Sequence, residues 1–458
     1  MQPIEINTDL IRSYDKSGPR YTSYPTAVQF DVAFSADDYN KQIELSNERN
    51  GDLSLYFHIP FCDTICFYCG CNKIVTKNRK RAEPYLERLY KEIELQASLF
   101  DNKRTVSQLH WGGGTPTFIS QQQMQQLMDV TRKYFNLLAD DNGEYSIEID
   151  PREANKETIV LLRKLGFNRI SLGVQDFNPQ VQKAVNRIQS IEETEEVIVA
   201  ARDTGFHSVS IDLIYGLPLQ SVASFTETLT KVIELDPDRI SIFNYAHLPE
   251  MFKTQRQMNS NDIPSPQVKL EILQQAIFQL TKAGYVYIGM DHFAKPNDEL
   301  TKAQNNKNLY RNFQGYSTHA DCDLIGLGVT SIGKVANCYS QNVKTIEEYY
   351  ALLDNNQLPV FRGVELNDDD LLRREVINQL ICHYYLNFEE IEKQFEINFG
   401  SYFETELTQI QKMQTDGLVT LGDKEITVNP IGYLLIRNIC MVFDRYLAGS
   451  KNSFSKVI

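Results

Sequence analysis

Strand-like and helix-like segments alternate along the chain from about residue 51 to residue 294. The strand-like segments are short and rich in β-branched and aromatic residues, and stretches with helical periodicity, such as 81–100, 120–136 and 266–283, separate them. This α/β order predicts a parallel sheet with helices packed outside it. The expected strands are 53–59, 106–111, 144–150, 169–175, 208–215, 239–245 and 285–291.

Six or seven such units favour a parallel (β/α) barrel or partial barrel over a flat, doubly wound sheet. In parallel α/β folds, functional residues gather at the carboxyl ends of the strands, which meet at one edge. Polar residues and glycines stand at these strand ends here, so we expect one site on one rim. They are Cys62, Gly112–Gly114, Glu148, Asp150, Gln175, Asp212 and Asn244–His247.

The segments on either side of the alternating region have different patterns. Residues 1–50 show no strand pattern, and the stretch Pro19–Thr26, which contains tyrosine and proline, indicates an ordered extended arm. Helical stretches near 369–384, 386–396 and 401–415 precede a short strand pair and a last helix, an order typical of a winged helix. We expect a 1–50 N-terminal arm, a 51–295 barrel core, a 296–365 barrel extension and connection, and a 366–458 mainly helical, winged-helix-like domain.

Net charge and composition limit which kinds of partner the protein can bind and in which cellular compartment we expect it. The 458 residues include 60 acidic and 46 basic side chains, a formal net charge of −14, which disfavours nucleic acid because phosphate binding needs a basic face. The first residues show no secretory signal, and no stretch approaches the ~20 apolar residues of a membrane span. The sequence shows no exposed apolar repeat of the kind that would indicate an obligate partner. We therefore expect a monomeric, cytoplasmic protein that is not inserted in a membrane.

Four of the eight cysteines lie within ten residues: Cys62, Cys66, Cys69 and Cys71. Clustered cysteines in a reducing compartment are usually metal ligands, and scattered ones are usually buried apolar residues. Soft thiolates select zinc, copper(I) or iron–sulfur clusters. Structural zinc sites usually combine two ligand pairs, and no second C-x2-C or H-x3-H follows here.

The spacing of the first three cysteines, C-x3-C-x2-C, has a particular chemical consequence. Three cysteines on one loop can bind three irons of a four-iron cluster and leave the fourth iron for a chelating ligand. Cys71 lies only two residues after Cys69, which makes coordination of the same cluster awkward. We therefore place Cys71 beside the metal site and not on the iron.

For each of the other residues on this rim, the sequence is compatible with a chemical role or with a purely structural one. Glycines at 112–114 would let a ligand approach the backbone. Asp212 lies inside an apolar strand and needs partners, because an unpaired buried carboxylate is costly. Arg187 could equally be a surface helix arginine, and Asp150 a solvated strand-end carboxylate. For His58 we expect a structural hydrogen-bonding role, and we predict no histidine ligand.

The cysteine spacing, its place after the first strand and the aromatic residue before Cys69 resemble the radical S-adenosylmethionine superfamily. The segments Ser17–Thr26, His58–Cys62, Cys69–Lys73 and Asp291–Ala294 are similar to the oxygen-independent coproporphyrinogen oxidases within it. The resemblance implies a partial barrel of the superfamily type and an oxidoreductase of porphyrin (haem) biosynthesis. It would convert two propionate side chains of coproporphyrinogen III to vinyl groups by oxidative decarboxylation, through a 5′-deoxyadenosyl radical, and give protoporphyrinogen IX.

The resemblance also implies cofactors, a redox partner and residue roles. The cofactors are one [4Fe-4S] cluster and two molecules of S-adenosylmethionine, and the partner is a small electron donor such as flavodoxin or ferredoxin. Cys71 and Glu148 are implied as catalytic residues, with Glu148 also accepting the ribose hydroxyls. The implied metal ligands are Cys62, Cys66 and Cys69. The implied cofactor-binding residues are Tyr56, Phe67, Tyr68, Gly113, Gly114, Thr115, Glu148, Gln175, Arg187, Asp212, Ala246 and Ile332.

The implied substrate carries four carboxylates while the chain is acidic, so basic residues must line its entry. By position, these are Arg20, Lys73, Arg311 and Lys334. Tyr21, Tyr24 and Tyr56 could stack on the tetrapyrrole or the adenine, or be buried core residues.

Two other functions are compatible with parts of the sequence. A related haem chaperone would keep the three-cysteine motif and transfer haem, but the Cys71–Lys73 extension and the N-terminal arm favour the oxidase. A zinc-stabilised scaffold would be colourless with one zinc per chain. The enzyme would be brown and oxygen-sensitive, with about four irons and four sulfides.

Overall fold

The computed structural model describes residues 4–139, 141–320 and 322–447. Contacts divide the chain into two compact units. The sheet unit consists of Phe30–Ala283 and Asp321–Glu365, and the helical unit of Met1–Gln29, Gly284–Ala320 and Leu366–Ile458. The four ranges expected from the sequence differ from these units and stay a prediction. Residues 1–3 of the predicted arm and 448–458 of the predicted last domain lie outside the described residues.

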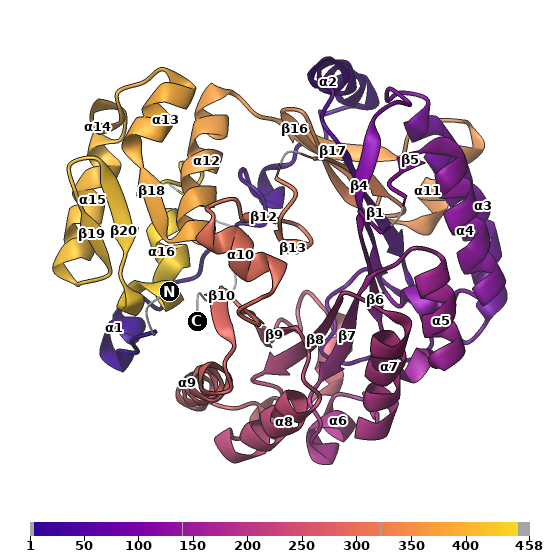
Figure 1. The fold of residues 1–458 in the computed structure, drawn as a ribbon, viewed down its shortest axis with the longest axis horizontal. Coiled ribbons are helices and arrows are strands. Elements are labelled where there is room, and N and C mark those ends of the chain that lie inside the picture. Colours follow the sequence, from indigo (N-terminus) through magenta and orange to yellow (C-terminus); the bar gives the residue numbers. More distant parts are fainter. Residues whose placement is uncertain (1–3, 140, 321, 448–458) are drawn as a thin grey trace. The chain divides into compact units, whose positions relative to one another are not determined.

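A mixed sheet runs through the sheet unit (Figure 1). Parallel strands pair in the order β9-β8-β7-β6-β4-β1, and β14 pairs in parallel with the other side of β1. The antiparallel strands β15, β16 and β17 follow β14. The bounds are β1 (Leu53–Ile59), β4 (Thr105–Gly113), β6 (Glu144–Ile149), β7 (Arg169–Gln175), β8 (Ser208–Tyr215), β9 (Arg239–Asn244), β14 (Asp323–Leu327), β15 (Ile332–Val335), β16 (Cys338–Asn342) and β17 (Val360–Glu365).

Alternating burial along the strands separates an apolar face from a polar one. In β6, β7 and β8, buried apolar residues alternate with partly exposed residues. The partly exposed set includes Glu148, Ser171 and Asp212, which the strand period of two places on one face. The predicted row of polar residues therefore shares one face of the sheet.

Helices α3, α4, α5, α7 and α8 run along the outer side of the sheet (Figure 1). Ser120, Ser190 and Ser221 begin α4, α7 and α8 with capping boxes, which satisfy backbone N–H groups of the first turn. Among residues 4–139, 141–320 and 322–447, no helix is long and apolar enough to cross a membrane. The bounds are α2 (Ala36–Arg49), α3 (Ala82–Ala97), α4 (Gln121–Tyr134), α5 (Lys156–Lys164), α6 (Pro179–Ala184), α7 (Ile191–Thr204), α8 (Val222–Glu234), α9 (Pro266–Lys282) and α11 (Ile346–Asp354).

In the helical unit, helices precede a strand pair, as expected for residues 366–458. Strands β19 and β20 pair antiparallel, and β18 adds to β20 on the other side. The rings of Phe388 and Phe399 stack with their centroids 4.1 Å apart, which joins α13 to α14. The bounds are α12 (Asp368–His383), β18 (Tyr385–Asn387), α13 (Phe388–Phe395), α14 (Phe399–Tyr402), α15 (Glu404–Thr415), β19 (Val419–Leu421), β20 (Glu425–Val428) and α16 (Ile436–Met441).

One expectation about a single element is wrong. The segment 285–291 is not a parallel barrel strand, because β10 (Val286–Gly289) pairs antiparallel with β11 (His292–Ala294) in the helical unit. The parallel neighbour of β1 on this side is instead β14, within the range expected to be a barrel extension and connection. In the N-terminal range, α2 forms a 14-residue helix that Ser35 and Asp38 cap. Strand pairing depends on distant partners, so a local pattern could not assign it.

Candidate active site

The loop after β1 carries the three predicted thiol ligands. Its ends are held by two short strands, β2 (Phe61–Cys62) and β3 (Ile74–Val75), which pair in parallel. Inside the loop, the N–H of Phe67 donates to the carbonyl of Val185 at 3.0 Å, and the N–H of Cys69 donates to that of Cys66 at 3.2 Å. These bonds hold the part of the loop from Cys66 to Cys69 beside the end of α6.

Neighbouring groups set the ionisation of the thiols. The thiol of Cys71 donates a hydrogen bond to Cys69, and this bond, together with the charge of Lys73, lowers the pKa of Cys69 to about 6 against the effect of burial. Burial raises the pKa of Cys62 to about 11. The thiolate is the form that binds metal, so Cys69 is prepared as a ligand, and a bound cation would have to deprotonate Cys62.

Two arginines and one carboxylate surround Cys66. Arg187 directs Nη1 to the Cys66 Sγ at 3.5 Å and to the Asp150 carboxylate at 2.9 Å. Arg152 pairs with the same carboxylate at 2.6 Å, and its Nη2 lies 3.9 Å from the Cys66 sulfur. Burial alone would lower the pKa of Arg187, but nearby Tyr68, Asp150 and Cys66 raise it. Arg187 is therefore a buried part of the site and not a surface helix arginine.

The glycine segment at the end of β4 touches the cysteine loop. The N–H of Gly114 donates to the Ile59 carbonyl at 2.8 Å, and the Thr115 hydroxyl contacts the Cys62 Sγ at 3.6 Å. A Cβ on Gly114 would lie 2.7 Å from the Phe61 carbonyl oxygen and 3.0 Å from the Cys62 sulfur. Gly113 has a φ of +115°, which disfavours any other residue. Only glycine allows this approach of the two backbones.

Glu148 lies beside this segment on the polar face of the sheet. Its Oε2 accepts the N–H of Gly113 at 3.1 Å, and its Oε1 lies 3.3 Å from Nε2 of His110. Removal from water opposes the ionised form, but the contacts with His110 and Gly113 lower the pKa of Glu148 below its usual value. The ring of Tyr56 stacks on His110 with centroids 5.8 Å apart. The carboxylate is thus held ionised next to the glycines.

The remaining predicted cofactor residues also lie in the sheet unit. Asp212 in β8 accepts the hydroxyl of Ser171 at 2.9 Å, and burial raises the pKa of Asp212 to about 6. Gln175 ends β7 with a φ of 69°, and the Ala246 carbonyl accepts Nε2 of Gln255 at 3.2 Å. Phe67 and Tyr68 pack against the apolar cluster of Val181, Val185, Leu217, Tyr245 and Met258, and Ile332 begins β15.

The basic residues chosen for the substrate entry have other partners in the structure. Arg20 forms an ion pair with Asp291, and Arg311 is buried, with its guanidinium 4.9 Å from the Tyr316 ring centre. Lys73 donates to the Cys69 carbonyl at 2.9 Å. Lys334 lies in β15. Their role in substrate entry stays a prediction. Tyr21 and Tyr24 are buried.

Two functional residues were missed by the sequence reasoning. His110 contacts Ser146 at 2.6 Å as well as Glu148, because the β4–β6 register places His110 opposite Ser146. Arg152 approaches Cys66 from the turn after β6. A signal for His110 existed, since a strand residue two positions before Gly112 points to the same face as that glycine. His58 is buried and contacts Tyr56 and the Asn72 carbonyl, as expected for a structural histidine.

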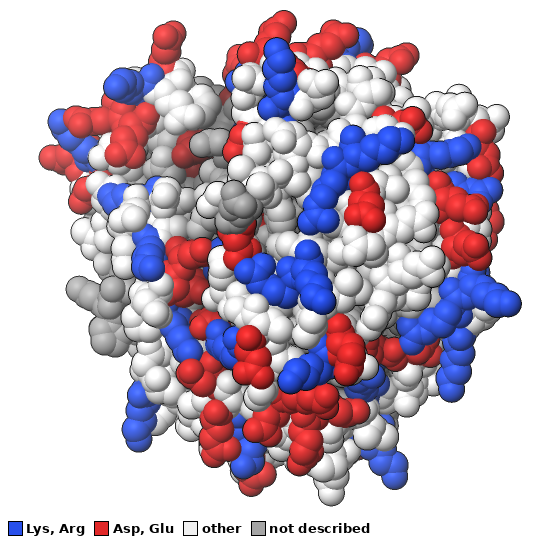
Figure 2. Space-filling model, turned by 45° about the vertical axis from the view of Figure 1, so that its right-hand side comes forward, with Lys and Arg blue, Asp and Glu red and all other residues white. Residues whose placement is uncertain are grey.

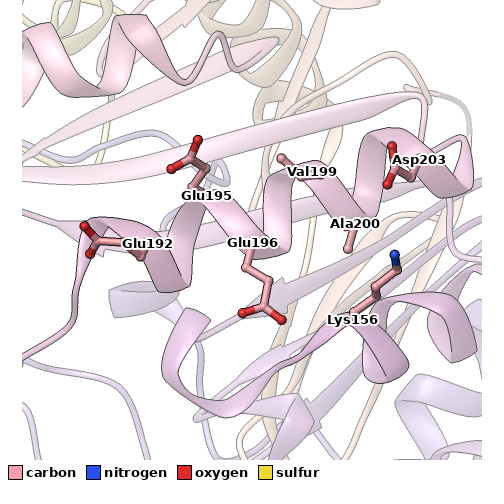
Figure 3. Close-up of a pocket in the computed structure, with 7 residues that line it drawn as sticks. All are labelled: Lys156, Glu192, Glu195, Glu196, Val199, Ala200 and Asp203. Carbon is pink, nitrogen blue, oxygen red and sulfur yellow. The ribbon is translucent and has the colours of Figure 1, made fainter.

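A groove between α5 and α7 is lined by Lys156 and by the carboxylates of Glu192, Glu195, Glu196 and Asp203, and it contains no cysteine (Figure 3). In the part of the chain that the structure describes, no three His, Cys, Asp or Glu side chains are grouped so as to hold a single metal ion. A four-iron cluster binds each cysteine through a different iron, so its thiolates need not converge on one point.

Comparison with known proteins identifies the family. Residues 56–232 match the model of the radical SAM superfamily, and residues 366–435 match that of the HemN C-terminal domain. The oxygen-independent coproporphyrinogen III oxidase of Pseudomonas aeruginosa is 54% identical over 459 residues, covering 100% of both chains. The chain belongs to the oxygen-independent coproporphyrinogen III oxidase family. Another member of this family, from Escherichia coli, is 49% identical over 460 residues.

A solved structure agrees with this membership of the oxygen-independent coproporphyrinogen III oxidase family. Coproporphyrinogen III oxidase (HemN) from Escherichia coli, described as a radical SAM enzyme, superposes with a TM-score of 0.93 at 47% sequence identity. The match covers 97% of this chain and 100% of that chain. The fold is therefore the radical SAM α/β fold with a mixed, largely parallel sheet.

Proposed function

We propose that the chain decarboxylates two propionate side chains of coproporphyrinogen III oxidatively to vinyl groups, without oxygen, and gives protoporphyrinogen IX. One observation carries the proposal: the thiol loop and the glycine segment approach so closely that a Cβ on Gly114 would lie 3.0 Å from the Cys62 sulfur. The predicted metal-binding thiol of Cys62 thus lies beside a glycine backbone that could bind the amino acid part of S-adenosylmethionine. Membership of the family supplies the substrate.

The donor set fits a [4Fe-4S] cluster. Cys62, Cys66 and Cys69 offer three soft thiols on one turn, and the pKa of Cys69 is already lowered to about 6 by the hydrogen bond from Cys71 and by Lys73. Arg187 and Arg152 beside Cys66 supply positive charge for a thiolate. Cys71 donates a hydrogen bond to Cys69 and is exposed, so it is free for a role beside the cluster.

The glycine segment and Glu148 fit S-adenosylmethionine. The backbone of Gly113 and Gly114 would receive the methionyl group, and the ionised Glu148 would accept two ribose hydroxyls. When bound, cluster and S-adenosylmethionine supply a carbon radical that removes hydrogen from the substrate. The protein residues orient these groups and exclude water from them. Gln175, Arg187, Asp212 and Ala246 would contact a second S-adenosylmethionine, giving two per chain.

The proposal extends to the partner and the compartment. The cluster needs one electron from outside, which we assign to a small donor protein such as flavodoxin or ferredoxin. The chain would act as a monomer in the cytoplasm. Light scattering of the reconstituted protein would give a mass near 52.7 kDa if it is a monomer.

The test is an anaerobic assay of the reconstituted and reduced protein with S-adenosylmethionine and coproporphyrinogen III. 5′-Deoxyadenosine and protoporphyrinogen IX are measured together, and we expect both. Deoxyadenosine without the porphyrinogen would keep the radical chemistry and reject the substrate. Neither product, from protein with an intact cluster, would contradict the proposal and favour haem transfer. A Cys66→Ala variant is the matched control. It lacks one predicted cluster thiol and leaves the rest of the chain unchanged, so it should form neither product.

A further inference from the structure

A basic segment directly follows the cysteine loop. Five of the nine residues 73–81 are Lys or Arg and none is acidic, in a chain whose formal net charge is −14. The face shown in Figure 2 carries both signs of charge side by side, and α7 presents a row of carboxylates (Figure 3). An uninterrupted basic segment is therefore unusual in this acidic chain.

The segment is held against a predicted cluster ligand. Val75 pairs with Cys62 in the β2–β3 register, and the N–H of Thr76 donates to the Cys62 carbonyl at 2.9 Å. Arg79 fixes the next turn by pairing with Asp63 and with Glu153. Lys77, Lys80 and Arg81 are exposed, and Val75 beside them is 39% exposed. A molecule seated on this segment would stand one short strand away from Cys62.

The free cations of this segment have no evident structural purpose. In the described part of the chain, Lys77, Lys80 and Arg81 form no ion pair, unlike Arg79. Lys80 and Arg81 also directly precede the first turn of α3, where the helix dipole disfavours positive charge. Arg81 stands at the N-cap position of α3 and makes no side-chain capping bond there. Lys80 and Arg81 thus oppose the dipole of α3, and Lys77 and Lys80 gain no ion-pair partner among the described residues, which points to a partner outside the protein.

We infer that the basic segment, residues 73–81, is the docking site for an acidic one-electron carrier protein that reduces the cluster. The inference rests on the proposed function, which needs one electron per cleavage. In each encounter the carrier's cofactor is oxidised by one electron and the cluster is reduced by one. Complementary charge would raise the association rate and orient the carrier, and exposed Val75 would supply an apolar contact.

The experiment separates protein-driven from chemically driven reduction. The Lys77→Glu/Lys80→Glu variant is assayed with reduced flavodoxin, chosen as a small acidic one-electron carrier, and in parallel with dithionite. The matched control is Lys103→Glu/Lys164→Glu, which makes the same charge change at exposed residues. Lys103 precedes β4 and Lys164 ends α5, so both lie at the opposite edge of the sheet from the cysteine loop.

We expect the flavodoxin-driven kcat/KM at low salt to fall by about tenfold or more in Lys77→Glu/Lys80→Glu, while the control stays near the unaltered protein. Iron content, dithionite-driven rate and KM for coproporphyrinogen III should not change. Binding of oxidised flavodoxin, measured by calorimetry without turnover, should weaken in parallel.

Three outcomes would overturn the inference. Equal flavodoxin-driven rates in both variants, with dithionite activity intact, would place docking elsewhere. A raised KM for coproporphyrinogen III in the dithionite assay would assign the segment to the substrate carboxylates. Absence of dithionite-driven product from the unaltered protein would reject the proposed function itself, and this inference with it.

Discussion

Arg187 holds its Nη1 3.5 Å from the sulfur of Cys66, although the two residues stand 121 positions apart in the chain. Asp150 accepts the same nitrogen at 2.9 Å, which neutralises part of the arginine charge and fixes the guanidinium plane. The fold therefore places the Cys66 thiol of the cysteine loop next to the positive charge of Arg187, which Asp150 holds in position.

Replacing Cys66 with Ala should abolish cluster assembly. One iron would lose its protein ligand, and we expect iron and sulfide to fall from about four per chain to near zero after reconstitution. Arg187 keeps Asp150 as a partner, so the chain should still fold. Cys338→Ala is the control, since that buried thiol in β16 lies outside the loop. A full cluster absorption spectrum in Cys66→Ala would contradict the ligand assignment.

Replacing Cys71 with Ser should separate cluster binding from decarboxylation. Serine keeps a donor for the hydrogen bond to Cys69, so iron and sulfide should stay at about four per chain. Protoporphyrinogen IX formation should fall by about 100-fold or more if the thiol itself takes part in the reaction. Cys71→Ala, which lacks the donor, should show the same loss. Loss of iron in the serine variant would instead make Cys71 a ligand.

Replacing Gly114 with Ala should weaken binding at the glycine segment. The new Cβ would lie 2.7 Å from the Phe61 carbonyl oxygen, a backbone atom that cannot yield easily, and 3.0 Å from the Cys62 sulfur. Such overpacking costs about 1–3 kcal/mol. If S-adenosylmethionine binding bears this cost, its affinity falls by about 5- to 150-fold. Equilibrium dialysis measures it. Gly400→Ala is the control, because the nearest atom there lies 3.7 Å from the added Cβ. Unchanged affinity would remove this segment from the cofactor site.

Much of the site could be predicted because its signals are local. The cysteine spacing, the three glycines and the carboxylates all stand at the ends of strands that the sequence pattern locates within one or two residues. The pairing register then brings Glu148 beside Gly113, as the parallel order of β4 and β6 requires. Local pattern and parallel topology together were enough for these residues.

What was missed depends on contacts between distant parts of the chain. His110 has no motif of its own, and its role appears only once β6 lies beside β4. Strand β14 is short and contains Gly326, so its pairing with β1 could not be read locally. Arg152 looked like an ordinary turn residue until the fold placed it 3.9 Å from Cys66.

A buried carboxylate on α3 gives the sheet unit a predictable pH dependence. Glu92 is fully enclosed and accepts the N–H of Gly328, the side chain of Asn342 and the hydroxyl of Tyr349. Burial raises the pKa of Glu92 from 4.5 to about 7, against these lowering bonds. Between those pH values the folded chain holds a proton that the unfolded chain has released. The stability from this group is thus complete below pH 4.5 and is lost as the pH rises through 7.

Glu92→Gln should therefore flatten this dependence. In the unaltered protein, the free energy of unfolding should fall by up to about 3 kcal/mol between pH 4.5 and pH 7.5 because of Glu92. Glutamine stays neutral, so this part of the fall should be absent in the variant. Trp111, the one tryptophan of the sequence, is buried in β4 and reports unfolding of the sheet unit by fluorescence in urea. Glu94→Gln, an exposed change two residues further along α3, is the control and should leave the slope unchanged. Equal slopes in all three proteins would mean that Glu92 stays ionised in the folded state and that its three donors outweigh its burial.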